Sequence, residues 1–265
     1  MPDTVLKIFS YLPNPRVWKA VIAGKLGGVD VEVVGDKPRE LGKWLWDFEP
    51  RALSDSERTD DSPYARIGRR GFSGALYKTD AFLSAHPFGT VPAAFSPDGS
   101  VGVFESNSIL RAVARAASQE SGLYGEDGYQ ASRIDSFLDA DLVFAREAQV
   151  YLLGIDKISE ESYQRMSAAY EFYLSGIEAT LSDNEYLAGN SLTIADISFV
   201  CDFAQFLREG HYEEQLAEQG LSLISEGGQK EYPRAYEHML ELNGRLEFSE
   251  VMGSYLSWYR RKSEG

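Results

Sequence analysis

Glu105 and Ser106 stand where a helix is predicted to begin, directly after a short apolar strand at residues 101–104. The first backbone N–H groups of a helix have no partner inside it, and the helix dipole favours a negative charge at that end. A serine hydroxyl adds one more donor beside them. The pair therefore predicts a position that binds an anion, and the alternative is that Ser106 only caps its own helix.

A second group of donors follows the first predicted strand, residues 5–11. Ser10 and Tyr11 carry hydroxyls at the end of that strand, and Asn14 stands just before Pro15. Asparagine is a good N-cap and proline suits the first helical position, so a helix is expected to begin here. Because an amide also donates a hydrogen bond without titrating, Asn14 is either a donor to a ligand or only a helix cap.

The elements that position these two groups occupy the first 117 residues. Apolar and β-branched runs predict strands, while apolar residues three and four apart predict helices. The order is strand, helix, strand, then a β-hairpin and a helix. The predicted segments are residues 5–11, 15–26, 29–34, 91–95, 101–104 and 106–117.

Residues 36–85 interrupt this order as a long insertion with little periodicity. The insertion contains Trp44, Trp46 and Phe48, then a polar run, and one short helix is expected at residues 79–85. Long irregular segments inside a compact domain are uncommon and often functional. The three aromatic residues are interpreted as a wall or lid over a substrate, with a solvated loop as the alternative.

The rest of the chain is predicted to be helical after a polar, glycine-containing linker at residues 118–128. Helical spacing of apolar residues recurs to the end, which indicates an all-helical domain at residues 129–265. Thr193 and Asp196 form a capping box, which stabilises a helix and does no chemistry. The periodic stretches are residues 134–145, 163–181, 193–207, 232–242 and 250–259.

Composition excludes several classes of protein. The 265 residues carry 26 Lys and Arg against 41 Asp and Glu, a net charge of −15, which disfavours nucleic acid and anionic membrane surfaces as partners. No apolar stretch is long enough to span a membrane, and the first residues lack the pattern of a signal peptide. Cys201 is the single cysteine, so neither a disulfide, a dithiol motif nor a zinc motif can be assembled, and cytosol is the expected compartment.

Three motifs resemble the glutathione transferase superfamily, whose order of elements is also similar. Residues 88–92, Phe-Gly-Thr-Val-Pro, resemble its turn into the third strand, and residues 104–109 resemble its Glu-Ser-x-x-Ile helix start. Residues 187–196, which end in Leu-Thr-Ile-Ala-Asp, resemble its C-terminal segment. The resemblance implies an α/β plus all-α fold: a thioredoxin-like βαβ-ββα domain at residues 1–117, followed by a helical bundle.

The resemblance implies that the N-terminal domain binds glutathione. The Val91–Pro92 bond would be cis, and the Val91 backbone would pair with the cysteine of glutathione like an added strand. Ser106 would take the γ-glutamyl carboxylate, and Glu105 would help to hold the ammonium. The glycine carboxylate needs a donor or a cation, for which the candidates are Lys78, His86, Arg69 and Arg70.

The resemblance also implies that a residue after the first strand stabilises the glutathione thiolate. That role requires a donor near a helix N-terminus, and the family uses Tyr, Ser or Cys for it. This segment has no cysteine, so Asn14 is the first candidate, Tyr11 the second and Ser10 the third.

A pocket for an electrophile is expected between the two domains. The first helix of the C-terminal domain faces that pocket in this fold. At helical spacing the same residues are alternatively core or dimer contacts. The candidates are Phe137, Asp141, Phe144 and Tyr151.

The leading interpretation is a transferase that activates the glutathione thiolate for attack on an electrophilic aromatic molecule, as in detoxification or aromatic ether cleavage. Residues 14–19 resemble bacterial lignin β-etherases of this superfamily. Residues 103–109 and 134–155 resemble the transferase-like domain of the elongation factor one gamma subunit. The alternative is therefore a non-catalytic protein-assembly module, and a homodimer is the expected assembly for this fold.

Overall fold

The computed structural model describes residues 4–68, 72, 74–257 and 259. The chain divides into two compact units between Ala117 and Ser118. An α/β first unit precedes a helical second unit, which is the predicted fold class. Arg69 and Arg70, two of the candidate cations, lie outside the described residues.

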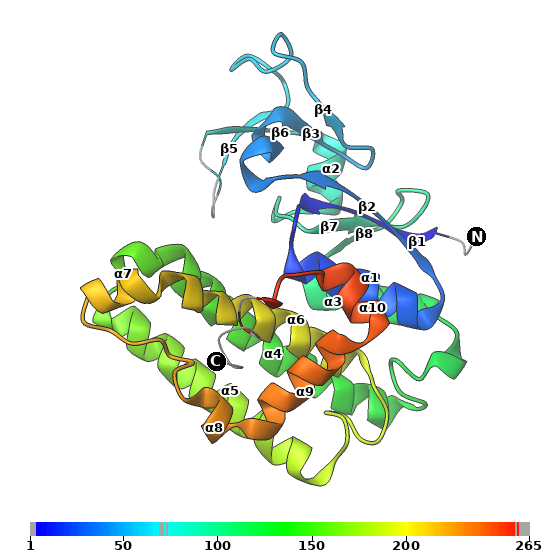
Figure 1. Ribbon diagram of the computed structural model, residues 1–265. Coiled ribbons are helices and arrows are strands. Elements are labelled where there is room, and N and C mark those ends of the chain that lie inside the picture. Colours follow the sequence, from blue (N-terminus) through cyan, green and yellow to red (C-terminus); the bar gives the residue numbers. More distant parts are fainter. Residues whose placement is uncertain (1–3, 69–71, 73, 258, 260–265) are drawn as a thin grey trace. The chain divides into compact units, whose positions relative to one another are not determined.

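A four-stranded mixed sheet with the order β2-β1-β7-β8 forms the centre of the first unit (Figure 1). β1 runs parallel to β2 and antiparallel to β7, which is antiparallel to β8. Helices α1 and α3 pack against each other on one side of this sheet, and α2 lies on the other side. The bounds are β1 Thr4–Tyr11, α1 Pro15–Gly27, β2 Asp30–Asp36, α2 Asp80–Ala85, β7 Ala93–Phe95, β8 Gly102–Phe104 and α3 Ser106–Ala116.

The insertion builds a second small sheet with the order β4-β3-β6-β5, which sequence periodicity did not predict. Its strands are only two to four residues long, and β3 pairs with β6, about thirty residues away, so they leave no local pattern. The predicted helix is present as α2, capped by Thr79. The elements are the 3₁₀ helix η1 Pro38–Lys43, β3 Trp44–Trp46, β4 Arg51–Ala52, β5 Ala65–Ile67 and β6 Ala75–Lys78.

Aromatic residues of the insertion pack on the main sheet. Trp46 is 1% exposed, and its ring lies edge-on to Phe9 and Phe82 at centroid distances of 5.6 and 5.8 Å. Trp44 and Phe48 are half-buried against the same cluster. The expected lid is therefore wrong for Trp46, because its ring fills the core between β1 and α2 and lines no open wall.

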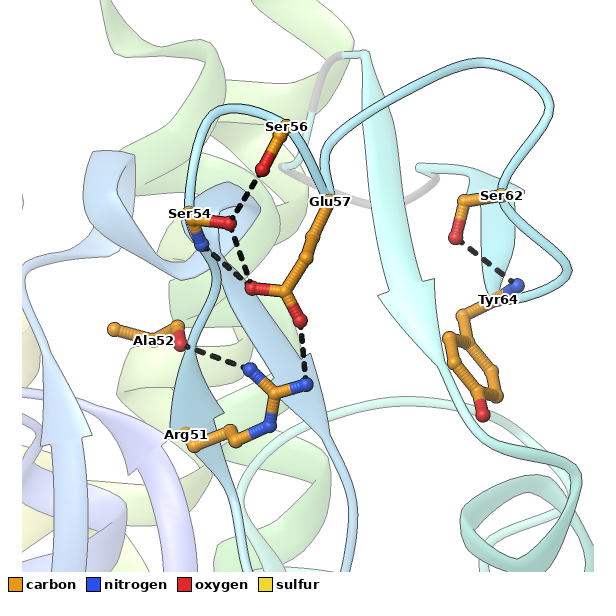
Figure 2. A network of polar contacts seen from close by, with 7 residues as sticks. All are labelled: Arg51, Ala52, Ser54, Ser56, Glu57, Ser62 and Tyr64. Atoms are coloured by element: carbon orange, nitrogen blue, oxygen red, sulfur yellow. Dashed lines mark hydrogen bonds and ion pairs between the residues drawn. The ribbon is translucent and has the colours of Figure 1, made fainter.

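A polar network closes the exposed loop that follows β4 (Figure 2). Arg51 Nη2 donates to Glu57 Oε1 at 2.6 Å, and both the backbone N–H and the hydroxyl of Ser54 donate to Glu57 Oε2, at 2.9 and 2.8 Å. The Ser54 hydroxyl also lies 3.1 Å from that of Ser56. Glu57 therefore fixes a turn that has no apolar core of its own.

The second unit is a helical bundle in which α6 is the central, buried helix. The predicted capping box is present, because Thr193 accepts from the first turn of α6 and Asp196 accepts from the Thr193 backbone. The last helix, predicted at residues 250–259, begins four residues earlier at Leu246 and is interrupted at Gly253, whose φ of 53° favours glycine. None of the described helices is long and apolar enough to cross a membrane. The helices are α4 Gly128–Gly154, α5 Glu160–Asp183, α6 Ile194–Phe206, α7 Glu213–Glu218, α8 Gly228–Glu231, α9 Pro233–Gly244 and α10 Leu246–Met252, with short 3₁₀ turns η2 Gln119–Ser121, η3 Ile155–Lys157 and η4 Leu207–Tyr212.

Candidate functional site

The register of the main sheet brings three candidate residues to one end of it. Phe9 of β1 is paired with Ala93 of β7, which is paired in turn with Phe104 of β8. Two positions beyond these paired residues come Tyr11 at the end of β1, Val91 before β7, and Ser106 at the start of α3. Antiparallel pairing places these three positions at the same end of the sheet.

The first turn of α3 has hydrogen-bond donors that no side-chain cap occupies. Glu105 is the N-cap residue and makes no side-chain capping bond, so Ser106 does not cap the helix. Glu105 has a φ of 66°, a conformation that typically costs a non-glycine residue about 1–3 kcal/mol. The Ser106 side chain is buried, at 6% exposure, and its hydroxyl makes no hydrogen bond within the described residues. This hydroxyl and the N–H groups of the first turn can therefore bind an anion.

The backbone of Val91 is also open. The Val91–Pro92 bond is cis, and neither the N–H nor the C=O of Val91 has a hydrogen-bond partner in the part of the chain that the structure describes. An extended peptide could therefore pair with Val91 as an added strand.

Of the three candidate catalytic residues, Ser10 and Asn14 are enclosed. Both side chains are 0% exposed, and Asn14 Nδ2 donates to Ser10 Oγ at 3.0 Å. Asn14 Oδ1 accepts from the backbone N–H of Arg16 at 3.0 Å, as an N-cap does. Tyr11 is half-buried beside the aromatic cluster, so it is the candidate with a side chain open to a ligand.

Lys78 contacts the loop that carries Val91. Its Nζ donates to the carbonyl of Gly89 at 2.6 Å and lies 4.5 Å from the ring centroid of Trp46. Burial, with a smaller effect of Arg66, lowers the pKa of Lys78. Lys78 thus holds the Gly89 carbonyl in place, two residues before Val91.

His86 does not fit the role of a cation for the glycine carboxylate. Its side chain is 1% exposed, stacked on Phe82 at 5.2 Å and edge-on to Phe95 at 4.7 Å. Burial lowers the pKa of His86 to about 4, against a smaller raising effect of the Ala94 backbone, so the ring is neutral at pH 7. His86 is a core residue, because aromatic rings surround it on the face covered by α2.

Comparisons with known proteins agree with this geometry. Residues 134–245 match the sequence family described as glutathione S-transferase, C-terminal domain. A glutathione S-transferase from Methylobacillus flagellatus KT, solved with GSH bound, shares the fold with a TM-score of 0.62 at 14% identity, covering 93% of this chain and 98% of that one. The chain therefore has the fold of glutathione transferases, and its C-terminal part is similar in sequence to their C-terminal domain.

Two curated relatives of the chain are proteins of different kinds. Glutathione S-transferase-like protein FUS3 of Gibberella moniliformis is 24% identical over 253 residues, which cover 93% of this chain and 91% of that protein. Elongation factor 1-gamma 1 of Oryza sativa subsp. japonica is 29% identical over 185 residues, 68% of this chain. The chain spans only 40% of the length of that elongation factor.

Most of the expected electrophile-pocket residues of this transferase fold lie in the core of the second unit. Asp141 is 1% exposed and accepts hydrogen bonds from Tyr173, at 2.9 Å, and from Ser198. Phe144 is also 1% exposed and stacks on Tyr173 with a centroid distance of 4.6 Å. The structure places both side chains in contacts among α4, α5 and α6, and their role in a pocket stays a prediction.

Phe137 and Tyr151, the other two candidates, lie in different surroundings. Tyr151 is buried and donates to Glu209 at 3.0 Å. Phe137 is half-buried beneath the guanidinium of Arg133, 4.7 Å from its ring centroid, and lines a groove of about 740 Å³ between α4 and α5. Phe137 thus lines a groove of the second unit, whereas Asp141, Phe144 and Tyr151 are buried.

Lys19 on α1 is a site neighbour that the sequence analysis missed. Its side chain is 0% exposed and Nζ donates to Asn107 Oδ1, at 2.8 Å, beside Ser106. A signal was present, because Lys19 interrupts the apolar run of α1 between Trp18 and Ala20. The described residues contain no group of three or more His, Cys, Asp or Glu that could hold a metal ion.

Proposed function

We propose that this protein is a glutathione-dependent transferase whose first unit binds glutathione at the end of the main sheet. The observation that carries the proposal is the Ser106 hydroxyl at the start of α3, which has no hydrogen-bond partner among the described residues and is not enclosed. An accessible donor beside the free N–H groups of a helix start is available to an anionic ligand. The open Val91 backbone, two positions beyond the same strand pairs, supports a peptide as that ligand.

In this proposal each part of glutathione meets a different group. The γ-glutamyl carboxylate accepts from the Ser106 hydroxyl and the first N–H groups of α3, and the exposed Glu105 carboxylate holds the ammonium. The cysteine backbone pairs with Val91. Its thiol then lies near the end of β1, where Tyr11 is the donor with an open side chain.

The chemical step follows from a stabilised thiolate. A hydrogen bond from the Tyr11 phenol lowers the pKa of the bound thiol, so that more thiolate is present at neutral pH. The sulfur attacks an electrophilic carbon, a carbon–sulfur bond forms, and the leaving group departs with the electrons of the broken bond and takes up a proton. We propose an aromatic electrophile, with aryl ether cleavage as one reaction to test with a panel of ethers.

The decisive experiment is calorimetric titration of glutathione into the wild type, Ser106→Ala and Ser108→Ala. Ser106→Ala should weaken binding by about 1–3 kcal/mol, the loss of a hydrogen bond to a charged group. Ser108→Ala removes a hydroxyl from the same helical turn and should leave the affinity unchanged. An unaltered Kd in Ser106→Ala would contradict the assignment of Ser106.

A non-catalytic assembly module is the second candidate. The similarity to elongation factor 1-gamma supports it, and so does the burial of Ser10 and Asn14, two of the three candidate catalysts. This candidate predicts that the wild type does not bind glutathione even at millimolar concentration. The calorimetric titration therefore separates the two functions.

We also propose a cytoplasmic homodimer. Cys201 is buried and forms no disulfide, which is compatible with a reducing compartment. The long helices α4 and α5 expose apolar side chains that a second copy could cover, among them Val143 at 62%, Leu153 at 70% and Phe172 at 80%. Sedimentation equilibrium should give twice the mass of the chain, and a monomer at micromolar concentration would contradict this part.

A further inference from the structure

A lysine is buried beside the first turn of α3. Lys19 belongs to α1, which packs against α3, and its side chain is 0% exposed. Its Nζ donates to Oδ1 of Asn107, at 2.8 Å, and the Asn107 side chain is 2% exposed. Asn107 is the second residue of α3 and directly follows Ser106. One hydrogen bond therefore ties α1 to the helical turn that carries the proposed carboxylate site.

Apolar packing alone does not account for a lysine at this position. The neighbouring positions of α1 are filled by Val17, Trp18 and Ala20, all buried. Lysine is among the residues least often fully buried, because its amine loses hydration there. A methionine has nearly the same length and would pack without that loss. What Lys19 adds to packing is a donor at the end of a long side chain, and the structure shows Asn107 accepting from it.

The turn that receives this bond also contains a strained residue. Glu105 has a φ of 66° and no side-chain capping bond, so α3 begins without the cap that usually fixes a helix start. A strained conformation persists only where its surroundings hold it. The contact from α1 to Asn107 supplies a restraint just after Glu105, and it acts on the side of α3 packed against α1.

We propose that Lys19 is a positioning residue for glutathione. Through Asn107 it holds the first turn of α3 in the orientation in which Ser106 and the free N–H groups meet the γ-glutamyl carboxylate. The inference rests on the proposed function and adds to it a residue that does not touch the ligand. Because the hydrogen bond to Asn107 lies at the carboxylate end, the proposal predicts that removing Lys19 weakens the contacts of that end and leaves those of the cysteine and glycine parts unchanged.

The test uses two ligands that differ by one carboxylate. Glutathione and 4-aminobutyryl-cysteinylglycine, which lacks the α-carboxylate of the γ-glutamyl part, are titrated into the wild type, Lys19→Met, Asn107→Ala and the double variant. Lys19→Met should raise the Kd of glutathione about tenfold, within the range of coupling between contacting residues, and leave that of the analogue unchanged. Asn107→Ala should do the same, and the double variant should be no weaker than either single variant.

Controls separate positioning from a general loss of structure. Lys25→Met removes an exposed lysine from the last turn of the same helix and should bind both ligands like the wild type. Urea unfolding identifies the variants that are folded, and Asn107→Ala keeps the test decisive if Lys19→Met does not fold. Equal weakening of both ligands, or additive effects in the double variant, would overturn the inference while the proposed function stands. A wild type that binds neither ligand would overturn the proposed function and the inference with it.

Discussion

Two buried polar residues, Asp196 of the second unit and Ser106 of the first, have different surroundings. In the second unit, Asp196 is 0% exposed, and its carboxylate accepts from the backbone N–H groups of Leu187 and Thr193, both at 2.9 Å, and contacts His238 Nε2 at 2.9 Å. In the first unit, the Ser106 side chain is 6% exposed, and its hydroxyl has no hydrogen-bond partner within the described residues and is not enclosed. We call a polar group saturated when its hydrogen bonds are all made within the protein. A saturated group stabilises the fold and cannot bind a ligand, whereas an unsaturated group is available for binding.

Glu209 follows the pattern of Asp196. It is buried and accepts from the Tyr151 hydroxyl at 3.0 Å and from the backbone N–H groups of Ile224 and Ser225, at 3.2 and 2.6 Å. Burial raises the pKa of Glu209, and these hydrogen bonds oppose that effect. Its carboxylate therefore anchors the segment before α8 and is another saturated group.

The largest expected effect is a loss of stability when the saturated carboxylate of Asp196 is removed. Asp196→Ala should lower the free energy of unfolding by about 3–5 kcal/mol, because it removes the capping box and leaves several buried donors unpaired. Urea denaturation followed by circular dichroism measures this change. Glutathione affinity of the folded variant should stay at the wild-type value.

A matched control for Asp196→Ala is Glu185→Ala, which removes an exposed carboxylate from the preceding turn. Its free energy of unfolding should stay within about 0.5 kcal/mol of the wild type. If Asp196→Ala lowered the free energy of unfolding as little as this control, the number of hydrogen bonds that a buried group makes would not predict its contribution to stability.

The sequence was sufficient to predict elements with strong local signals. Asn14 before Pro15 marked the start of α1, the Pro-Asp-Gly-Ser turn at residues 97–100 marked the β7–β8 hairpin, and the capping box marked α6. Glu105 and Ser106 were also placed correctly at the start of α3. Caps and turns depend on side chains within a few residues, so a single sequence contains them.

What could not be predicted depends on contacts between distant residues. The small sheet of the insertion depends on pairing Leu45 with Tyr77. Asp141 has the residue type of a pocket carboxylate, and only its hydrogen bonds from Tyr173 and Ser198, 32 and 57 positions away, show that it is a core acceptor. Residue type and spacing identify polar groups, but their saturation is a property of the folded core.

A smaller effect on stability is expected at the end of β1, where the saturated Asn14 lies close in sequence to Tyr11, the proposed ligand donor. Asn14→Ala should lower the free energy of unfolding by about 1–2 kcal/mol, the usual cost of losing an N-cap, and leave the thiol pKa of bound glutathione unchanged. Tyr11→Phe, the matched variant, should raise that thiol pKa with little change in stability. Thiolate absorbance as a function of pH measures both proteins. A thiol pKa raised by Asn14→Ala instead would make Asn14 the thiolate donor despite its burial.

The smallest effect is expected in the exposed network of Figure 2, which is saturated but not buried. The hydrogen bond from Arg51, then those from Ser54, lower the pKa of Glu57 from its usual 4.5 to about 2. Since the folded-state pKa lies below the usual one, the network stabilises the loop above pH 4.5 and this contribution is lost as the pH falls towards 2.

Because solvent screens this site, the loss should be local and leave the melting temperature unchanged. At pH 7, Glu57→Gln should therefore speed hydrogen exchange of the Ser54 amide, whose N–H donates to Glu57 Oε2, while the exposed control Glu49→Gln should not. Amide exchange measured by NMR, together with calorimetric melting, checks both parts. If Glu57→Gln lowered the melting temperature as much as Asn14→Ala does, burial would not explain why a saturated network contributes to stability.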